Sequence, residues 1–210
     1  MKQTINGLYI ITDKKLIPRE NFTEIVEQAI RGGAGIVQLR EKQINIKEIH
    51  ELGTNLLKIT KKYDVPLIIN DYVDIACEIG ADGVHLGEND PDIKFARRKL
   101  GENKIIGVSC YNDLERGQYA VENGADYIVF GTPYYTPTKP EREPTSLETL
   151  IEAKKKFADT TVFAIGGISE NNAKEILETG VDGIAAITSI FGNGSPEENA
   201  KKLSVFFNKD

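Results

Sequence analysis

The segment 80–87 reads Gly-Ala-Asp-Gly-Val-His-Leu-Gly, a glycine turn that leads into a short apolar run. Similar turns begin at Gly33, Gly124 and Gly180, which puts 47, 44 and 56 residues between successive copies. A glycine that follows a helix can adopt the left-handed conformation that ends it. Each interval has room for two strand–helix units, so the repeat predicts an α/β fold made of four similar quarters.

Eight short runs rich in β-forming residues are spread along the whole chain. They are almost continuously apolar rather than alternating, which is typical of parallel strands buried on both faces. Segments with apolar residues at helical spacing lie between them, for example 21–31 and 46–62. The expected strands are 8–12, 36–39, 66–70, 83–87, 105–110, 127–131, 161–166 and 183–188.

Eight strands, each followed by a helix, in one chain of 210 residues predict a closed barrel. The expected fold is therefore α/β, a single (β/α)8 TIM barrel that forms one domain over residues 1–210. An open, doubly wound sheet is the alternative, but no Gly-x-Gly-x-x-Gly pattern follows the first expected strand.

Composition and charge narrow the class of protein. Hydrophobic residues make up 40% and charged residues 28%, which suits a soluble globular chain. A net charge of −6 argues against a general nucleic-acid binder, which needs a basic surface. No apolar run approaches the roughly 20 residues of a membrane helix, and two cysteines are too few for a disulfide framework. We therefore expect a cytoplasmic protein with reduced thiols.

The loop 132–144 follows the sixth expected strand and contains four prolines. A long, stiff loop at the end of a barrel strand lies on the C-terminal face, where such barrels carry their chemistry. We expect this loop to contact substrate, and a merely tolerated insertion is the alternative.

Polar residues at the end of the second expected strand indicate an anion site. Period-two alternation puts Gln38 and Arg40 on the same side, pointing into the barrel mouth. An Arg grips phosphate oxygens in a bidentate fork, and Lys42 would add a point charge. The alternative is an ordinary salt bridge with Glu41.

Two aspartates follow neighbouring expected strands. Asp71 comes directly after the third strand, and Asp90 lies just beyond the fourth. Carboxylates at adjacent strand ends can converge on one hard cation, and Mg²⁺ needs only one or two of them. The alternative is that each aspartate caps the helix that follows it, because Asp before Pro91 is a good capping pattern.

The remaining strand ends suggest a second anion site and no protein nucleophile. Gly167 and Thr188 follow the seventh and eighth strands, where such barrels commonly bind phosphate through backbone N–H groups. Ser109 could donate to a phosphate or simply sit in its strand. Cys110 has no catalytic histidine partner in view, and His85 is more typical of a packed core residue. Neither a Ser-His-Asp arrangement nor a zinc spacing is visible in the sequence.

Taken in order, these motifs resemble the thiamine-phosphate synthase family. The resemblance covers essentially the whole chain and rests on 8–13, 38–42, 69–71, 83–87 with Asp90, 107–109, 136–139 and 164–168. It implies a transferase that condenses 4-amino-2-methyl-5-(diphosphooxymethyl)pyrimidine with a thiazole phosphate, giving thiamine phosphate and pyrophosphate. The pyrimidine would leave as a stabilised cation, with Mg²⁺ assisting the departure of pyrophosphate, and the thiazole nitrogen would then attack it.

The resemblance also implies a role for each candidate residue. The pyrimidine diphosphate would be held by Gln38, Arg40, Lys42, Asn70, Ser109 and Lys139, and Mg²⁺ by Asp71 and Asp90. The thiazole phosphate would be held by Thr136, Thr138, Gly167, Ile187 and Thr188. Leu39, Glu41 and Pro137 are expected to contact substrate, and the catalytic roles fall to Arg40, Lys42, Ser109 and Lys139.

Three other interpretations are weighed against this one. A paralogous thiazole tautomerase shares the fold, but it carries a histidine where this chain has Tyr111. A non-catalytic barrel that binds a thiamine precursor would gain nothing from Asp71, Asp90 and Lys42. Other phosphate-binding barrels would show a general base inside the barrel, and we see no convincing candidate. The expected partners are the two small-molecule substrates, without nucleic acid or membrane, and assembly into a homo-oligomer is left open.

Overall fold

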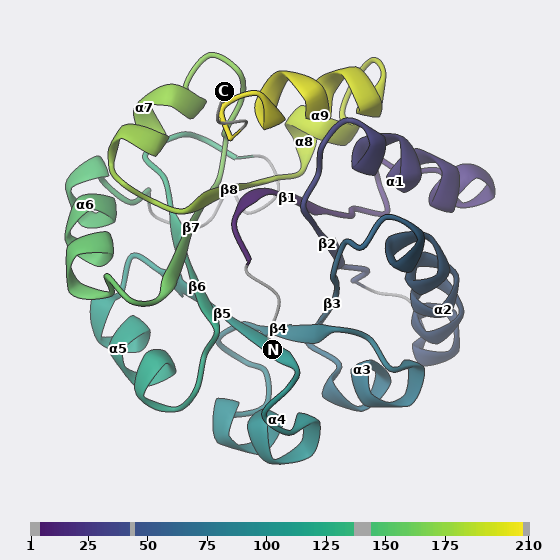
Figure 1. Ribbon diagram of the computed structural model, residues 1–210, viewed down its shortest axis with the longest axis horizontal. Helices are drawn as coiled ribbons and strands as arrows, with labels where there is room; N and C mark the ends of the chain where they lie inside the picture. The colour runs from purple at the N-terminus through teal and green to yellow at the C-terminus, as the bar shows by residue number, and fades with distance from the viewer. Residues whose placement is uncertain (1–4, 43–44, 137–143, 208–210) are drawn as a thin grey trace.

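The computed structural model describes residues 5–42, 45–136 and 144–207, and it shows a closed barrel of parallel strands inside a ring of helices (Figure 1). Strands pair in chain order, and β8 returns to pair with β1. The strands are β1 (Gly7–Ile11), β2 (Ile36–Leu39), β3 (Leu67–Asn70), β4 (Gly83–Leu86), β5 (Ile105–Tyr111), β6 (Tyr127–Gly131), β7 (Thr161–Ile165) and β8 (Gly183–Ala186). The predicted (β/α)8 TIM barrel is therefore confirmed.

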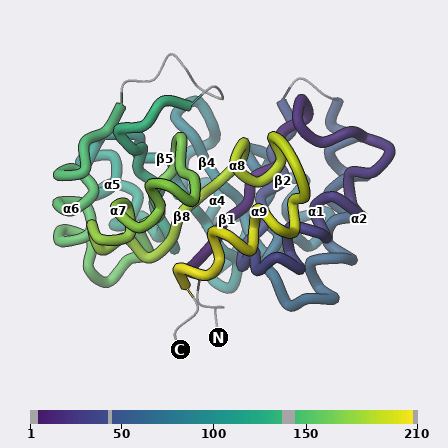
Figure 2. Tube along the Cα trace, turned by 90° about the horizontal axis from the view of Figure 1, so that it is seen from above, coloured from purple at the N-terminus to yellow at the C-terminus, as the bar shows by residue number. Residues whose placement is uncertain are grey.

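The helices fill the intervals as the repeat requires. They are the 3-10 turn η1 (Arg19–Asn21), α1 (Phe22–Arg31), α2 (Ile46–Lys62), α3 (Val73–Ile79), α4 (Ile93–Leu100), α5 (Leu114–Glu122), α6 (Leu147–Lys156), α7 (Ala173–Glu178), α8 (Thr188–Phe191) and α9 (Pro196–Ser204). Helix α9 packs beside α1 (Figures 1 and 2), where the Ser204 hydroxyl donates to the Gly32 carbonyl at 2.8 Å. No helix of the described ranges is long and apolar enough to span a bilayer.

Most strand boundaries differ from the predicted ones by a residue or two. The largest correction is at the last strand, which was expected over 183–188 but ends at Ala186. The chain turns there into α8, which begins at Thr188. Gly80 ends α3 with φ of 71°, and the other repeat glycines also have positive φ, as the turn pattern predicts.

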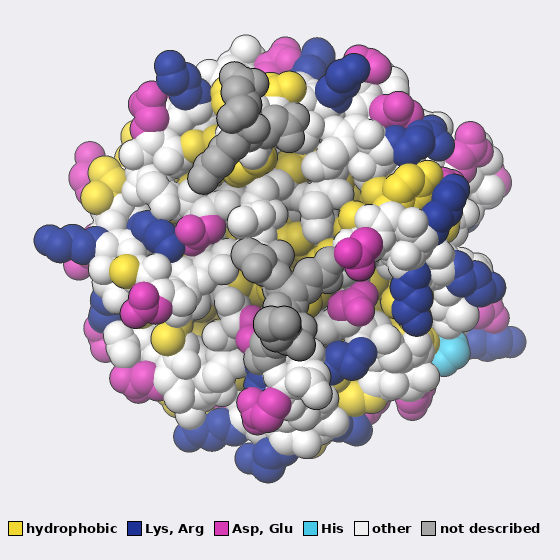
Figure 3. All heavy atoms as spheres, in the orientation of Figure 1, with side chains coloured by type: hydrophobic (Ala, Val, Ile, Leu, Met, Phe, Trp, Pro, Cys, Tyr) yellow, Lys and Arg dark blue, Asp and Glu magenta, His cyan; other side chains and the backbone are white. Residues whose placement is uncertain are grey.

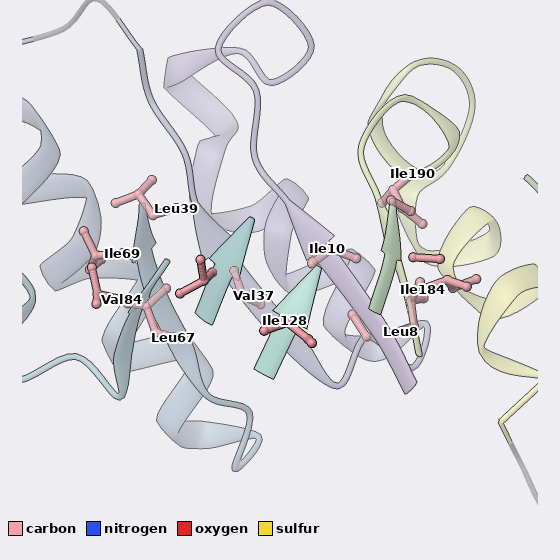
Figure 4. Packing of buried hydrophobic residues seen from close by; sticks show 14 of the residues in the cluster. Leu8, Ile10, Val37, Leu39, Leu67, Ile69, Val84, Ile128, Ile184 and Ile190 are labelled. Carbon is pink, nitrogen blue, oxygen red and sulfur yellow. The ribbon is translucent and has the colours of Figure 1, made fainter. Parts of the chain in front are cut away.

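Successive residues of each strand face two different cores, because strand side chains alternate between faces. Leu8, Ile10, Val37 and Leu39 belong to the outer core between strands and helices (Figure 4). The inner core fills the barrel and is built around three aromatic rings in edge contact, Tyr9, Tyr127 and Phe163.

Glycines make room for these rings inside the barrel. A Cβ on Gly107 would lie 1.9 Å from the ring of Tyr127, and one on Gly183 would lie 2.3 Å from the ring of Phe163. Since these approaches are far shorter than any real carbon contact, only glycine fits at both positions. These packed rings therefore fill the interior of the barrel, whereas its C-terminal end is left open.

Three of the repeated glycine turns carry an aspartate two residues after the glycine, and these aspartates lie at the N-terminal rim of the barrel. The Asp82, Asp126 and Asp182 carboxylates each accept the backbone N–H at the start of the preceding strand, at 2.9, 2.8 and 2.8 Å. Cationic side chains hold two of them, since Arg97 pairs with Asp126 at 2.6 Å and Lys154 with Asp182 at 2.7 Å. Figure 3 looks onto this face and shows side chains of both charges interspersed around its outline.

Candidate active site

The C-terminal ends of the strands surround a cavity of about 340 Å³. Every strand, or the residue just beyond it, contributes to its wall, so the cavity sits on the barrel axis. This is the face where barrels of this kind place their chemistry. Of the predicted site residues, the wall includes Gln38, Arg40, Asn70, Ser109, Thr136 and Ile187.

Strand β2 presents its side chains as the alternation predicts. Gln38 and Arg40 line the cavity, whereas Leu39 lies in the outer core with 1% of its surface exposed. Glu41 is also buried, and its carboxylate accepts from Arg19 at 2.7 Å. The alternative of a salt bridge between Glu41 and the cations of its own segment is therefore wrong. Leu39 and Glu41 remain predicted substrate contacts, although neither side chain lines the cavity.

Burial raises the pKa of Glu41, and the charge of Arg19 acts in the opposite direction. The Thr12 hydroxyl also donates to this carboxylate, at 3.1 Å. These bonds hold the chain that carries Arg40 against β1 on the outside of the barrel. Glu41 is thus well suited to positioning the segment 40–42.

Asp71 and Asp90 lie together at the mouth, beside Lys42. The ammonium of Lys42 pairs with the Asp71 carboxylate, and one oxygen of Asp90 accepts the Gly87 N–H at 2.6 Å. Burial and then the hydrogen bond to Asp71 raise the pKa of Asp90 to about 6. Two carboxylates that share a site in this way favour a cation between them.

The donor set suits Mg²⁺ better than a transition metal. The described residues hold no group of three or more His, Cys, Asp or Glu side chains that could ligate a metal. Mg²⁺ is commonly held by one or two carboxylates, with waters and substrate phosphates completing its shell. Asp71 and Asp90 would therefore meet the requirement together with a diphosphate.

The structure removes the capping alternative for both aspartates. Helix α4 is capped by Asp92, whose carboxylate accepts the Lys94 N–H at 2.9 Å, so Asp90 lies ahead of the cap. Tyr72 occupies the N-cap position of α3, where no side chain accepts a hydrogen bond. Asp71 itself has φ of 66°, a left-handed conformation that costs energy for any residue with a Cβ.

A smaller cavity opens beside the first one, between the loop after β7 and the start of α8. Gly166, Gly167, Ile187, Thr188 and Thr136 line it. Gly167 has φ of 58°, and a Cβ there would lie 2.4 Å from the Tyr135 carbonyl oxygen, so this turn needs glycine. Four of the predicted thiazole-phosphate residues, Thr136, Gly167, Ile187 and Thr188, thus line one small cavity.

Other residues of the wall were not among the predicted site residues. Tyr111 has φ of 58°, and its hydroxyl accepts the Glu88 N–H at 3.2 Å. His85 lines the cavity while only 6% of its surface is exposed, and its Nε2 lies 2.8 Å from the Ser109 hydroxyl. It is therefore both a packed histidine and a site residue. The alternation that placed Gln38 inside the barrel could have placed His85 there as well.

Three predicted residues of the loop after β6, Pro137, Thr138 and Lys139, lie outside the described residues. Cys110, which the sequence left without a catalytic partner, is buried in the outer core. Burial raises the pKa of its thiol to about 12. It therefore cannot supply a thiolate at neutral pH.

Known proteins resemble this chain along almost its whole length. The family model for thiamine monophosphate synthase matches residues 8–190. The thiamine-phosphate synthase of Clostridium tetani is 42% identical over 202 residues, covering 96% of each chain. The chain belongs to the thiamine monophosphate synthase family. The thiamine-phosphate synthase of Alkaliphilus oremlandii is 44% identical over 199 residues, covering 95% of this chain and 94% of its own.

Solved structures agree with this assignment. The thiamine phosphate pyrophosphorylase of Pyrococcus furiosus has a TM-score of 0.85 and 38% identity, covering 94% of this chain and 93% of its own. A 3-hexulose-6-phosphate synthase, with a TM-score of 0.73 and 20% identity, shares the fold alone. The predicted family and enzyme class are therefore confirmed. These relatives lend no support to the tautomerase or to the non-catalytic barrel.

Proposed function

We propose that this chain condenses 4-amino-2-methyl-5-(diphosphooxymethyl)pyrimidine with a thiazole phosphate, and that the reaction takes place in the axial cavity with Mg²⁺ bound. The products are thiamine phosphate and pyrophosphate. The observation that carries the proposal is the convergence of Gln38, Arg40 and Ser109 on one cavity next to the Asp71–Asp90 pair. A thiamine monophosphate synthase needs a diphosphate seat of this kind.

The pyrimidine diphosphate takes the side of the cavity formed by β2 to β5. Gln38, Asn70 and Ser109 are polar groups in a wall that is otherwise largely apolar, so they orient the ring. Arg40 and Lys42 bind the diphosphate oxygens, and Asp71 and Asp90 would hold Mg²⁺. When bound, Mg²⁺ neutralises charge on the departing pyrophosphate. Lys139 adds a further cation in this proposal.

The thiazole phosphate takes the smaller cavity. Gly167, Ile187 and Thr188 offer backbone N–H groups to its phosphate, and Thr136 closes the site from the loop after β6. Thr138 and Pro137 are assigned to the same substrate. The two seats share Thr136 and Ile187, which brings the thiazole ring against the pyrimidine.

The chain's own residues then do three things. They hold the rings face to face, which replaces a bimolecular encounter by positioning. Arg40, Lys42 and Lys139 stabilise negative charge as the carbon–oxygen bond to pyrophosphate breaks. The apolar wall keeps water from the pyrimidine cation until the thiazole nitrogen attacks it. No step requires a protein nucleophile.

The test is to mix the protein with both substrates, with Mg²⁺ or with EDTA, and to follow thiamine phosphate and pyrophosphate. Mg²⁺-dependent, equimolar formation of both products is the expected result. Absence of product from a folded sample would contradict the proposal. Product formed at the full rate in EDTA would contradict the role of the metal but not the condensation itself. We also propose a cytoplasmic location, in keeping with the free thiols of Cys77 and Cys110.

A further inference from the structure

Five polar side chains form a continuous hydrogen-bonded chain across the inside of the barrel. The Gln38 amide donates to the Tyr9 hydroxyl at 2.5 Å, and the Tyr9 and Tyr127 hydroxyls lie 2.7 Å apart. Tyr127 meets His85 Nδ1 at 3.0 Å, and His85 Nε2 meets the Ser109 hydroxyl at 2.8 Å. The members come from β2, β1, β6, β4 and β5, so the chain crosses the barrel from one cavity wall to another.

Of these five residues, only Gln38, Ser109 and His85 can touch a ligand. Gln38, His85 and Ser109 line the cavity, whereas Tyr9 and Tyr127 have no exposed surface. The tyrosines are packed against Phe163 and each other beneath the cavity floor. Any influence they have on substrate must therefore pass through the residues above them.

The protons available on these side chains fix which group donates in each hydrogen bond of the series. Burial raises the pKa of both tyrosines well above the ordinary value, so each keeps its single hydroxyl proton. Because Gln38 donates to Tyr9, the Tyr9 proton is directed to Tyr127, and the Tyr127 proton is directed to His85 Nδ1. A neutral imidazole that accepts at Nδ1 carries its proton on Nε2. That proton is donated to Ser109, whose own proton is then directed elsewhere.

We propose that Tyr9, Tyr127 and His85 are positioning residues that fix the hydrogen-bond polarity of the pyrimidine seat. They leave the Gln38 carbonyl oxygen as an acceptor at one wall and the Ser109 hydroxyl as a donor at the other. An aminopyrimidine offers the complement, an exocyclic amino donor and ring nitrogen acceptors. A pyrimidine with an oxo group instead offers an acceptor and a ring N–H in their place, so the fixed polarity rejects it. This inference rests on the seat proposed above.

The hydrogen-bonded chain from Gln38 to Ser109, called the relay from here on, can be tested on the free protein. Nitrogen NMR of the imidazole reports which of its nitrogens carries the proton. The chain has two histidines, and His85→Gln identifies the signals of His85. The expected state is neutral, with Nε2 protonated and Nδ1 accepting. An Nδ1–H tautomer or an imidazolium would overturn the proposal.

Gln38→Glu gives a sharper version of this test. An ionised carboxylate can only accept from Tyr9, so every bond should reverse and the His85 proton should move to Nδ1. Spectra are recorded above the pH at which the carbon signal of the introduced carboxyl group titrates. Retention of the Nε2–H tautomer there would show that the two ends are not coupled.

Substrate discrimination provides the functional test. In Tyr127→Phe the ring remains but the relay is cut, so Ser109 can rotate to accept. We expect the ratio of kcat/KM between the amino substrate and its oxo analogue to fall about tenfold or more. Adding Tyr9→Phe should change this ratio little further, because the two hydroxyls act in series.

The matched control is Tyr63→Phe, which removes a hydroxyl bonded to Glu27 on the outside of the barrel. Its ratio should equal that of the parent protein. An unchanged ratio in Tyr127→Phe would overturn the specificity claim. If the parent protein formed no product at all, the proposed function would fail, while the NMR result would still decide whether the relay exists.

Discussion

The two ends of the barrel use the same residue type in opposite ways. At the N-terminal rim, the Asp126 and Asp182 carboxylates each accept a backbone N–H and pair with a half-buried cation. At the C-terminal mouth, Asp71 and Asp90 lie against each other, and their proximity contributes to the raised pKa of Asp90. Each of these rim carboxylates has a cation of its own, whereas the two mouth carboxylates share Lys42, which pairs with Asp71. The mouth therefore keeps two like charges together with less compensation.

The difference separates residues that stabilise the barrel from residues that bind ligands. A compensated carboxylate has little remaining affinity for a cation, whereas a close carboxylate pair is stabilised when a divalent cation binds. Two of the three described non-glycine residues with positive φ, Asp71 and Tyr111, also lie at the mouth. Stored strain and like charge are therefore found where we place the chemistry.

The largest expected effect is at the mouth. Asp90→Asn should lower kcat/KM by about 100-fold or more, because metal stabilisation of the leaving group accounts for several kcal/mol. Thermal stability without metal should be unchanged or higher, since a like-charge contact is removed. Steady-state kinetics over a range of Mg²⁺ concentrations, together with a melting curve, measure both quantities.

The control for this change lies two residues away. Asp92→Asn makes the same change of side chain at the cap of α4, where Asn caps a helix about as well as Asp, and it should leave kcat/KM within about twofold with little change in stability. Equal loss of activity in both variants would contradict the assignment of Asp90.

The rim should show the reverse pattern. Asp126→Ala leaves the Ile106 N–H without this acceptor and removes the carboxylate that pairs with Arg97, which keeps only carbonyl acceptors. We therefore expect a loss of about 2–3 kcal/mol in the free energy of unfolding. Urea denaturation measures this loss. The kcat/KM per folded molecule should be unchanged. A fall in kcat/KM comparable to that of Asp90→Asn would contradict a purely stabilising role for Asp126.

This contrast could be anticipated from the sequence only in part. The repeat of glycine turns and the period-two pattern predicted the barrel and placed Gln38 and Arg40 inside it. The roles of Asp71 and Asp90 stayed open, because a cap and a ligand look alike until the backbone is known. The backbone removed the cap, because Asp92 and Tyr72 hold the N-cap positions of α4 and α3, and the metal role of Asp71 and Asp90 stays a prediction. The tertiary partners of His85, Tyr127 on β6 and Ser109 on β5, are likewise invisible to local patterns.

A smaller effect is expected in the phosphate seat. Gly167→Ala places a Cβ 2.4 Å from the Tyr135 carbonyl oxygen and should raise the KM for the thiazole phosphate by about tenfold. The control is Gly194→Ala, which has φ of 74° and open space around it. It carries similar backbone strain, about 1 kcal/mol, and its KM should be that of the parent protein. Equal KM values in the two variants would show that the phosphate of this substrate does not bind at Gly167.

The smallest expected effect concerns Cys110. Its pKa of about 12 leaves almost no thiolate, so iodoacetamide at pH 8 should not alkylate it in the native protein. The protonated thiol is favoured by folding, so this contribution to stability is present below about pH 9 and is lost as pH rises toward 12. Mass spectrometry after digestion would locate the label. Rapid alkylation of Cys110 under native conditions would contradict its burial.

We propose that the carboxylate pair at the mouth holds the metal that faces the diphosphate. A crystal structure of the protein with Mn²⁺ and pyrophosphate, with anomalous scattering to locate the metal, tests this directly. We expect one anomalous peak ligated by Asp71 and Asp90, with pyrophosphate oxygens completing the shell and contacting Arg40. A peak elsewhere, or pyrophosphate bound away from this pair, would contradict it.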